Sequence, residues 1–188
     1  MFPRPDFFAG AQLNFAENLL FPPNVSIDES STAVVTVAED DSRAVSTSWL
    51  ELREAVRSCS SALRAAGVKE QDVVAGFISN HVEAVVAMLA SASLGAVWTS
   101  ISPDNGVTAV LDRLVQIKPR VLFADNGMVY NGKEWPSKAK SLQIVKELKK
   151  HGLELVIVVE NLQSQDLGLE ELKGEGLAAE EYQGFLHR

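Results

Sequence analysis

Short apolar runs alternate with helical patterns along most of the chain, and this rhythm constrains the fold more than any other feature. Runs of strand length stand at 33–38, 73–79, 97–101, 120–125 and 153–159. Longer segments with apolar residues at helical spacing lie between them. Strands joined through helices form βαβ units, in which neighbouring strands run parallel. The sequence therefore predicts an α/β fold, a Rossmann-like, mostly parallel sheet with flanking helices.

Local signals mark where two of the helices begin and end. Ser48 and Glu51 fit a capping box at the start of the first helix, and Gly67 is placed to close it in the left-handed conformation. The other helix follows the stretch SISPDNG, and we expect Asp104 to be its N-cap. Asp104→Ala should then lower the free energy of unfolding by about 1 kcal/mol. Pro119 should end that helix by pushing Lys118 toward extended geometry. Its apolar stripe, which should face the sheet, consists of Val107, Val110, Leu111, Leu114 and Val115.

Composition divides the chain into three parts. Residues 1–30 are rich in Phe, Pro and Asn, and we expect them to cover a hydrophobic surface. Residues 31–160 carry the α/β pattern. Residues 161–188 form an acidic carboxyl-terminal segment. Because 160–188 hold seven acids against two bases, we expect either exposed surface or an unfinished region of an incomplete domain, and not an active site.

Charge and hydropathy exclude several classes of partner. The net charge of −8 argues against nucleic acid or an anionic membrane, because both repel an acidic surface. No run approaches the roughly 20 apolar residues that span a bilayer. The amino terminus has no basic segment followed by an apolar core, as a secretory signal would. Cys59 is the one cysteine and cannot form an internal disulfide, so we expect a cytoplasmic protein.

Residues that could carry chemistry are few. No G-x-G-x-x-G, G-x-x-x-x-G-K-[ST] or G-x-S-x-G motif is present, and no histidine or cysteine has metal-ligand spacing, so we assign no catalytic residue and no metal ligand. Cys59 lies on an apolar helical stripe and is interpreted as a buried hydrophobe, not a reactive thiol. His81 follows a strand, where a polar turn residue is favoured over a catalytic base.

Lysines form one basic cluster in this acidic chain. Lys138, Lys140, Lys146, Lys149 and Lys150 are interpreted mainly as a solvated helix face. Lys133 differs because it is expected in a loop after a strand, where a phosphate contact is the alternative to a solvated position.

Three stretches carry a resemblance to a known family: FFAGAQLNFAENLL, EAVVAMLASASLGAVWTSISPDNGVTAVLDRLVQIKPRVLFAD and VYNGK. In order and spacing they resemble the acetoacetyl-CoA synthetases of the acyl-adenylate-forming superfamily, the AMP-dependent synthetases. The resemblance covers about residues 7–160, with a weaker echo in EYQGFL near the end. It makes 31–160 part of an AMP-dependent synthetase domain.

The resemblance implies a ligase of acyl-CoA and lipid metabolism. In the complete enzyme, ATP, Mg²⁺ and CoA are cofactors, and acetoacetate and CoA are substrates. The family's phosphate loop, adenine-binding segment and catalytic lid lysine are not found in these 188 residues. We therefore expect an amino-terminal fragment that is inactive alone and binds no cofactor of its own. Such a fragment should expose a sheet edge and an uncovered sheet face, through which it could self-associate. The alternative is a non-catalytic α/β binding or interaction module.

The resemblance also implies which residues lie on the CoA side. The turn with Ser102, Pro103 and Asp104 would border the pantetheine channel, and Lys133 would lie near the nucleotide end of CoA. The family usually reads Ser-Pro-Asp-Phe-Gly, whereas this chain has Asn105 in place of the aromatic residue. An aromatic side chain that could pack at the mouth of the channel is therefore missing.

Overall fold

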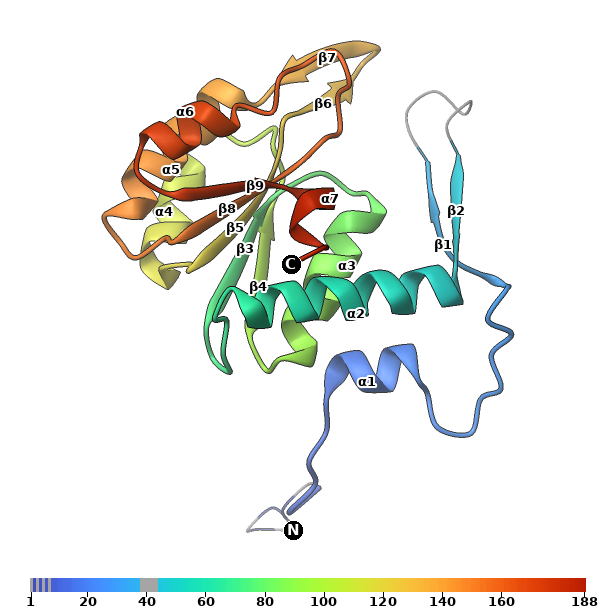
Figure 1. Cartoon of the computed structure of the whole chain (residues 1–188). Coiled ribbons are helices and arrows are strands. Elements are labelled where there is room, and N and C mark those ends of the chain that lie inside the picture. The colour runs from blue at the N-terminus through green and yellow to red at the C-terminus, as the bar shows by residue number, and fades with distance from the viewer. Residues whose placement is uncertain (1, 3, 5, 7, 38–43) are drawn as a thin grey trace.

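A five-stranded parallel sheet organises the protein, with helices on both of its faces (Figure 1). The computed structural model describes residues 2, 4, 6, 8–37 and 44–188. All pairings within the sheet are parallel, which confirms the predicted α/β fold. In spatial order the strands are β4 (Val97–Ile101), β3 (Val73–Phe77), β5 (Val121–Asp125), β8 (Leu155–Val159) and β9 (Ala178–Glu181).

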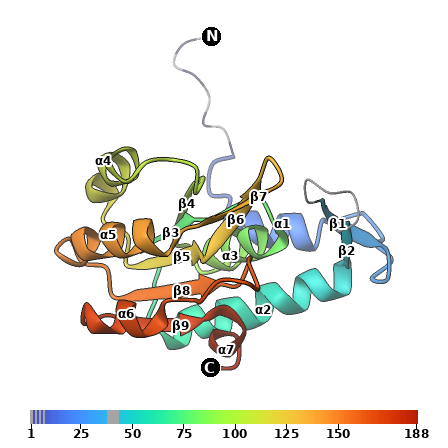
Figure 2. The ribbon, with the colours of Figure 1, turned by 90° about the horizontal axis from the view of Figure 1, so that it is seen from above.

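The helices divide between the two faces of the sheet (Figure 2). One face is covered by α2 (Trp49–Ala65), α3 (Val82–Ser93) and α7 (Tyr182–Phe185). The other is covered by α4 (Val107–Ile117), α5 (Lys138–Lys149) and α6 (Leu169–Gly174). The chain first builds β4 on one side of β3 and then crosses to build β5 on the other, so the strand order reverses between β3 and β5.

Side chains of successive strand residues point to opposite faces, and both faces are apolar. Phe123 and Ile157 pack in the core under α2 and α3, whereas Leu122, Val156 and Val158 pack in the core under α4 and α5. This two-sided burial explains why the central strands are continuous apolar runs without alternation. It also corrects the expectation of an uncovered sheet face, because helices of this chain cover both. Self-association stays a prediction.

Helix α2 begins and ends as its sequence predicted. The Glu51 amide donates to Ser48 Oγ (3.2 Å), and the Ser48 amide donates to Glu51 Oε2 (2.8 Å), which completes the capping box. Gly67 follows the helix with φ of +85°. Lys118 ends α4 differently from our expectation, because it is left-handed (φ 50°, ψ 66°) and not extended. The clash of Pro119 with a right-handed residue before it still ends the helix.

The acidic carboxyl-terminal segment contributes buried residues to the core, which corrects the expectation of exposed surface, while the incomplete domain stays a prediction. Its strand β9 pairs with β8, although its sequence, Ala-Ala-Glu-Glu, has low strand propensity. Phe185 is fully buried and Tyr182 nearly so. The Phe185 ring packs edge-to-face on Phe123 with centroids 6.3 Å apart. The segment is therefore extended because it pairs with the edge of β8, and not because its own sequence favours a strand.

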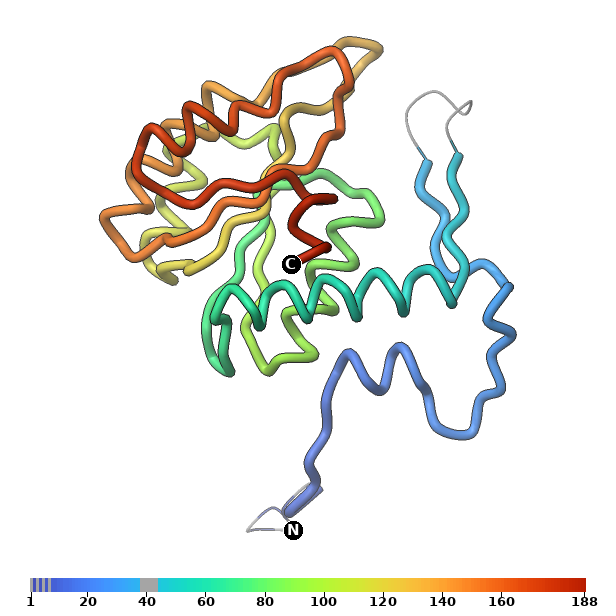
Figure 3. Tube along the Cα trace, in the orientation of Figure 1, coloured from blue at the N-terminus to red at the C-terminus, as the bar shows by residue number. Residues whose placement is uncertain are grey.

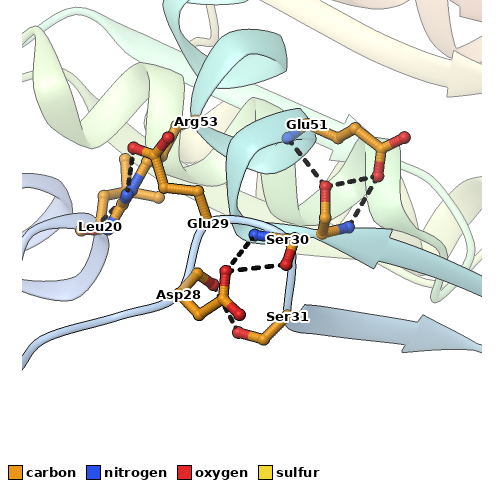
Figure 4. A network of polar contacts seen from close by, with 8 residues as sticks. Leu20, Asp28, Glu29, Ser30, Ser31, Glu51 and Arg53 are labelled. Carbon is orange, nitrogen blue, oxygen red and sulfur yellow. Dashed lines mark hydrogen bonds and ion pairs between the residues drawn. The ribbon is translucent and has the colours of Figure 1, made fainter.

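The amino-terminal segment crosses the outside of α2 and α3 before the sheet begins (Figure 3). Helix α1 (Phe15–Leu20) buries Ala16 and Leu20 against this surface. Arg53 of α2 donates two hydrogen bonds to the Leu20 carbonyl oxygen (3.0 and 2.8 Å) and pairs with Glu29 (3.2 Å; Figure 4). Its guanidinium also lies 4.6 Å from the centre of the Phe21 ring. One side chain thus fastens this segment to the helix beneath it.

Two antiparallel hairpins complete the fold. Strands β1 (Thr32–Thr36) and β2 (Val45–Ser48) form the first, which overlaps the strand predicted at 33–38; residue 38 and the polar turn at 39–43 lie outside the described residues. Strands β6 (Gly127–Tyr130) and β7 (Lys133–Pro136) form the second. Among the described residues, no helix has the length and apolar character needed to cross a bilayer.

Candidate functional site at the carboxyl edge of the sheet

The turns that follow β3, β4 and β5 meet at one edge of the sheet. In open parallel sheets, ligands bind at the carboxyl ends of the strands, where the strand order reverses. The reversal here lies between β3 and β5. The residues that follow β3, β4 and β5 are therefore the first place to look for a functional site.

A largely buried histidine and two carboxylates occupy the point of reversal. His81 Nε2 lies 2.9 Å from Asp125 Oδ1, and His81 Nδ1 lies 2.8 Å from Glu83 Oε2. The Asp125 side chain is fully buried, and its second oxygen accepts a hydrogen bond from the Ser79 amide (2.7 Å). The cluster thus joins the ends of β3 and β5 to the start of α3, where His81 is the N-cap residue.

The charge state of His81 follows from these contacts. Burial alone would lower the pKa of His81, but the hydrogen bonds to Asp125 and Glu83 outweigh it and raise the pKa to about 9. Burial would raise the pKa of Glu83, but the hydrogen bond with His81 holds it below its usual value. With this pKa, His81 is mostly an imidazolium at neutral pH, with Nε2 hydrogen-bonded to Asp125 and Nδ1 at ion-pair distance from Glu83. This arrangement fits the predicted polar turn residue and leaves no free nitrogen for a general base.

Asn126 shapes the same edge next to Asp125. Its amide nitrogen donates to the carbonyl oxygens of Leu162 (2.8 Å) and Gln165 (3.0 Å). Its side-chain oxygen accepts from the backbone amides of Asn161 and Leu162, both at 2.9 Å. The side chain is buried and its hydrogen-bonding capacity is used in full, so Asn126 fixes the chain that leaves β8.

The turn after β4 is closed by its own residues. The Asn105 amide donates to the Ser102 carbonyl oxygen (3.1 Å), and the Asn105 side chain donates to the same oxygen (3.2 Å) and to Asp104 Oδ1 (3.1 Å). A hydrogen bond with the Ser102 side chain is the main reason why the pKa of Asp104 is lowered. Pro103 is buried, whereas Ser102 and Asp104 are exposed. The turn therefore presents polar groups to solvent from a fixed backbone.

Asp104 is not the helix cap that we expected. Helix α4 begins at Val107, its N-cap residue is Gly106, and no side chain caps it. The turn itself explains the difference, because it extends through Asn105 and places Asp104 two residues before the cap. The apolar stripe is confirmed: Val110 and Leu114 are fully buried, and its other three residues pack against the same core.

Lys133 and Lys140 both follow β5 in the sequence. Of these two, Lys140 contacts the turn after β4. Lys140 of α5 donates to the Pro103 carbonyl oxygen (3.0 Å) and, more weakly, to that of Asn105 (3.5 Å). Lys133 is exposed and is the first residue of β7, directly after the Asn131–Gly132 turn of the β6–β7 hairpin, not in a loop after a strand. Among the described residues, Lys133 makes no ion pair.

An open groove of about 490 Å³ adjoins the histidine cluster. It lies between β1, α3 and β4, with apolar walls that include Met88 and Trp98 and polar groups that include Asn80, His81 and Ser100. A groove of this size next to the carboxyl edge is large enough for a small organic ligand.

Other candidate residues are accounted for by burial. Cys59 is fully buried, and burial raises the pKa of its thiol to about 12, as its interpretation as a buried hydrophobe required. Within the part of the chain that the structure describes, no group of three or more His, Cys, Asp or Glu residues is arranged to hold a metal ion.

Four residues of the site were missed by sequence reasoning, namely Glu83, Asp125, Asn126 and Lys140. Asp125 and Asn126 carried a usable signal, since two polar residues at the end of a buried apolar strand mark the carboxyl edge of a parallel sheet. Lys140 carried none, because its partner carbonyl is 37 positions away in the chain.

Comparison with known protein families places most of the chain in one of them. Residues 26–182 match the model of the family described as AMP-binding enzyme. A malonamoyl-CoA synthetase of Penicillium aethiopicum is 52% identical over 161 residues, which are 85% of this chain and 22% of that protein. An acetoacetyl-CoA synthetase of Gallus gallus is 41% identical over 162 residues, which are 86% of this chain and 23% of that protein.

A solved structure supports the same relationship. The acetoacetyl-CoA synthetase from Streptomyces lividans superposes with a TM-score of 0.81 and 34% sequence identity, covering 97% of this chain and 26% of that one. The chain thus spans about a quarter of the length of the relatives that it matches.

Proposed function

The chain belongs to the AMP-binding enzyme family, and from this membership we propose that it forms the CoA-side part of an AMP-forming acid–CoA ligase of the acetoacetyl-CoA synthetase type. One observation carries the proposal. The long sequence block shared with that family, residues 83–125, builds the turn after β4 and the end of β5 at the carboxyl edge, where parallel sheets bind ligands.

The reaction of the complete enzyme has two steps. A carboxylate oxygen of the acid attacks the α-phosphorus of ATP and pyrophosphate leaves; the sulfur of CoA then attacks the acyl carbon and AMP leaves. ATP, Mg²⁺ and CoA are the cofactors in this proposal. We assign residues of this chain to the second step only, with Ser102, Pro103 and Asp104 beside the pantetheine arm and Lys133 toward the nucleotide. The Lys133 side chain is exposed and makes no ion pair with the residues that the structure describes, which supports a contact of its ammonium with a phosphate group.

The acyl groups in the names of the two similar synthetases limit the choice of acid substrate for the complete enzyme. Acetoacetyl and malonamoyl groups both carry a carbonyl at the β-carbon and differ in a methyl or an amino group beyond it. We propose a short acid with a β-carbonyl as the substrate. Acetate, which lacks that carbonyl, should be a poorer substrate, because groups that hydrogen-bond the carbonyl would lose their partner.

A chimera tests this proposal. Residues 8–188 replace the matching quarter of the Streptomyces lividans acetoacetyl-CoA synthetase, and thioester formation is measured with acetoacetate, malonamate and acetate. We expect ATP-dependent thioester formation with at least one of the β-carbonyl acids and less with acetate. A chimera that folds, as judged by circular dichroism and cooperative melting, but forms no thioester from any of the three acids would contradict the proposal.

The 188-residue chain should not catalyse the reaction alone. Its sequence contains no phosphate-binding loop motif, so we expect no acid-dependent release of pyrophosphate from the purified chain. Turnover above a no-protein control that disappears on heating would show this expectation to be wrong.

A binding or interaction module is the second candidate, and one observation favours it. Helices of this chain cover both faces of the sheet, so the chain has the covered core that an independent domain requires. A monomer that melts cooperatively and binds no hydrophobic dye would favour the module. Aggregation with strong dye binding would favour a part that needs the rest of a larger enzyme.

A further inference from the structure

Lys140 connects helix α5 to the turn that follows β4. Its ammonium lies 3.0 Å from the Pro103 carbonyl oxygen and 3.5 Å from that of Asn105. Both oxygens belong to the backbone of the turn, so the contact constrains the path of the chain and not a mobile side chain. The lysine side chain is itself partly buried, which strengthens a hydrogen bond to a charged donor.

Other lysines of α5 make different contacts. Lys138 pairs with Asp166 (2.7 Å) and Glu171 (2.5 Å), and Lys149 donates to the Glu175 carbonyl oxygen. Lys146 has no hydrogen bond or ion pair among the described residues. Lys140 likewise pairs with no carboxylate in the described part of the chain, and its charge is met by backbone carbonyls alone.

Asn105 acts on the same turn from within. Its side chain donates to the Ser102 carbonyl oxygen and to Asp104 Oδ1, while Lys140 holds the carbonyls of Pro103 and Asn105 from α5. All four residues of the turn are therefore fixed by two side chains. A turn that normally carries an aromatic residue is stabilised here by polar contacts.

We propose that Lys140 is a positioning residue for the CoA-side turn: its ammonium fixes the Pro103 and Asn105 carbonyls and so holds Ser102 and Asp104 in the geometry that receives the pantetheine arm. The functional half of this inference rests on the proposed function. Lys140 touches neither substrate nor cofactor in this account. It acts through the backbone of residues 102–105.

The test compares three variants of the 188-residue chain with the wild type. Lys140→Met removes the ammonium and keeps most of the aliphatic length, Lys140→Arg keeps a charged donor, and Lys146→Met is the matched control on the same helix. Backbone amide chemical shifts of the 188-residue chain are recorded without ligand. CoA binding is then measured by calorimetry in the chimera that carries residues 8–188 with the same substitutions, because the chain alone is expected to bind no cofactor. Circular dichroism and thermal melting confirm that each variant folds.

We expect Lys140→Met to shift the amide signals of residues 103–107 without ligand and to weaken CoA binding about tenfold, the size of one charge-assisted hydrogen bond. Lys140→Arg should largely restore both, and Lys146→Met should change neither. Unchanged turn signals in Lys140→Met would overturn the inference, even if CoA binding weakened, because the ammonium would then contact the ligand directly. Turn signals that move in Lys140→Met while the chimera without this substitution binds no CoA would support the positioning role and count against the proposed function.

Discussion

Both ends of strand β5 are held by charged side chains, but these contacts differ in their exposure to water. At the amino end, Arg120 donates to the Gly67 carbonyl oxygen (2.7 Å), to Asp72 (3.0 Å) and to Glu154 (2.9 Å), with about a quarter of its side chain exposed. At the carboxyl end, Asp125 is fully buried and holds His81, whose side chain is only 10% exposed. Both ends join neighbouring strands through charged groups, but only one does so away from water.

This difference in burial predicts a difference in energy. Exposed ion pairs contribute little, because water and salt screen them. Removing one partner of a buried pair leaves an uncompensated charge and is far more costly. The carboxyl end should therefore be the rigid end of the sheet, and the turns that we assign to CoA are attached to it. Four predictions examine this contrast.

Asp125→Ala should have the largest effect. The change leaves the His81 imidazolium with Glu83 alone and the Ser79 amide without its acceptor. We expect a loss of about 3 to 5 kcal/mol in the free energy of unfolding at pH 7, measured by urea denaturation. Asp125→Asn, which keeps the shape and an acceptor, is the control and should cost less. A loss below 1 kcal/mol for the alanine variant would show that the cluster does not hold this edge.

The contribution of His81 should depend on pH. Its pKa rises from the usual 6.5 to about 9 in the folded protein, so protonation favours folding. The resulting stabilisation, about 3 kcal/mol, should be fully present below pH 6.5 and be lost as the pH rises through about 9. The measurement is the stability difference between wild type and His81→Gln from pH 6 to pH 10. A difference that stays constant over this range would mean that His81 is not an imidazolium at neutral pH.

Arg120→Ala should cost about 1 kcal/mol or less, because its ion pairs are partly exposed. Denaturation in low and high salt separates the charged contribution, which should shrink as salt rises. A loss as large as that of Asp125→Ala would remove the contrast between the two ends.

Asp104→Ala should have the smallest effect on stability, near zero, because Asp104 is not the cap of α4. The comparison is with Asp104→Asn in the same denaturant series. A loss of about 1 kcal/mol for alanine and almost none for asparagine would restore the helix-cap interpretation.

Features decided by neighbouring residues were predictable from the sequence. The capping box at Ser48 and Glu51 needs only a four-residue pattern, and the stripe with Val110 and Leu114 needs only helical spacing. The central strands were equally clear, because two covered faces require continuous apolar runs.

Features decided by distant residues were not predictable. Strand β9 forms because β8 offers an edge, and Ala-Ala-Glu-Glu carries no strand signal of its own. Lys140 was assigned to a solvated face, since nothing in the sequence brings its helix to Pro103. Asp104 was misplaced by a related error: a good cap residue was recognised, but the turn that displaces it depends on Asn105.

Hydrogen exchange with and without CoA tests most directly whether the carboxyl end of the sheet carries the site. Mass spectrometry of the chimera that carries residues 8–188 would follow peptides from both ends of these strands at millimolar CoA, because the chain alone is expected to bind no cofactor. We predict slower exchange in residues 100–107 and 127–136, and no change in residues 64–72 and 118–121 at the amino end. Protection at the amino end, or equal protection at both ends, would contradict the account.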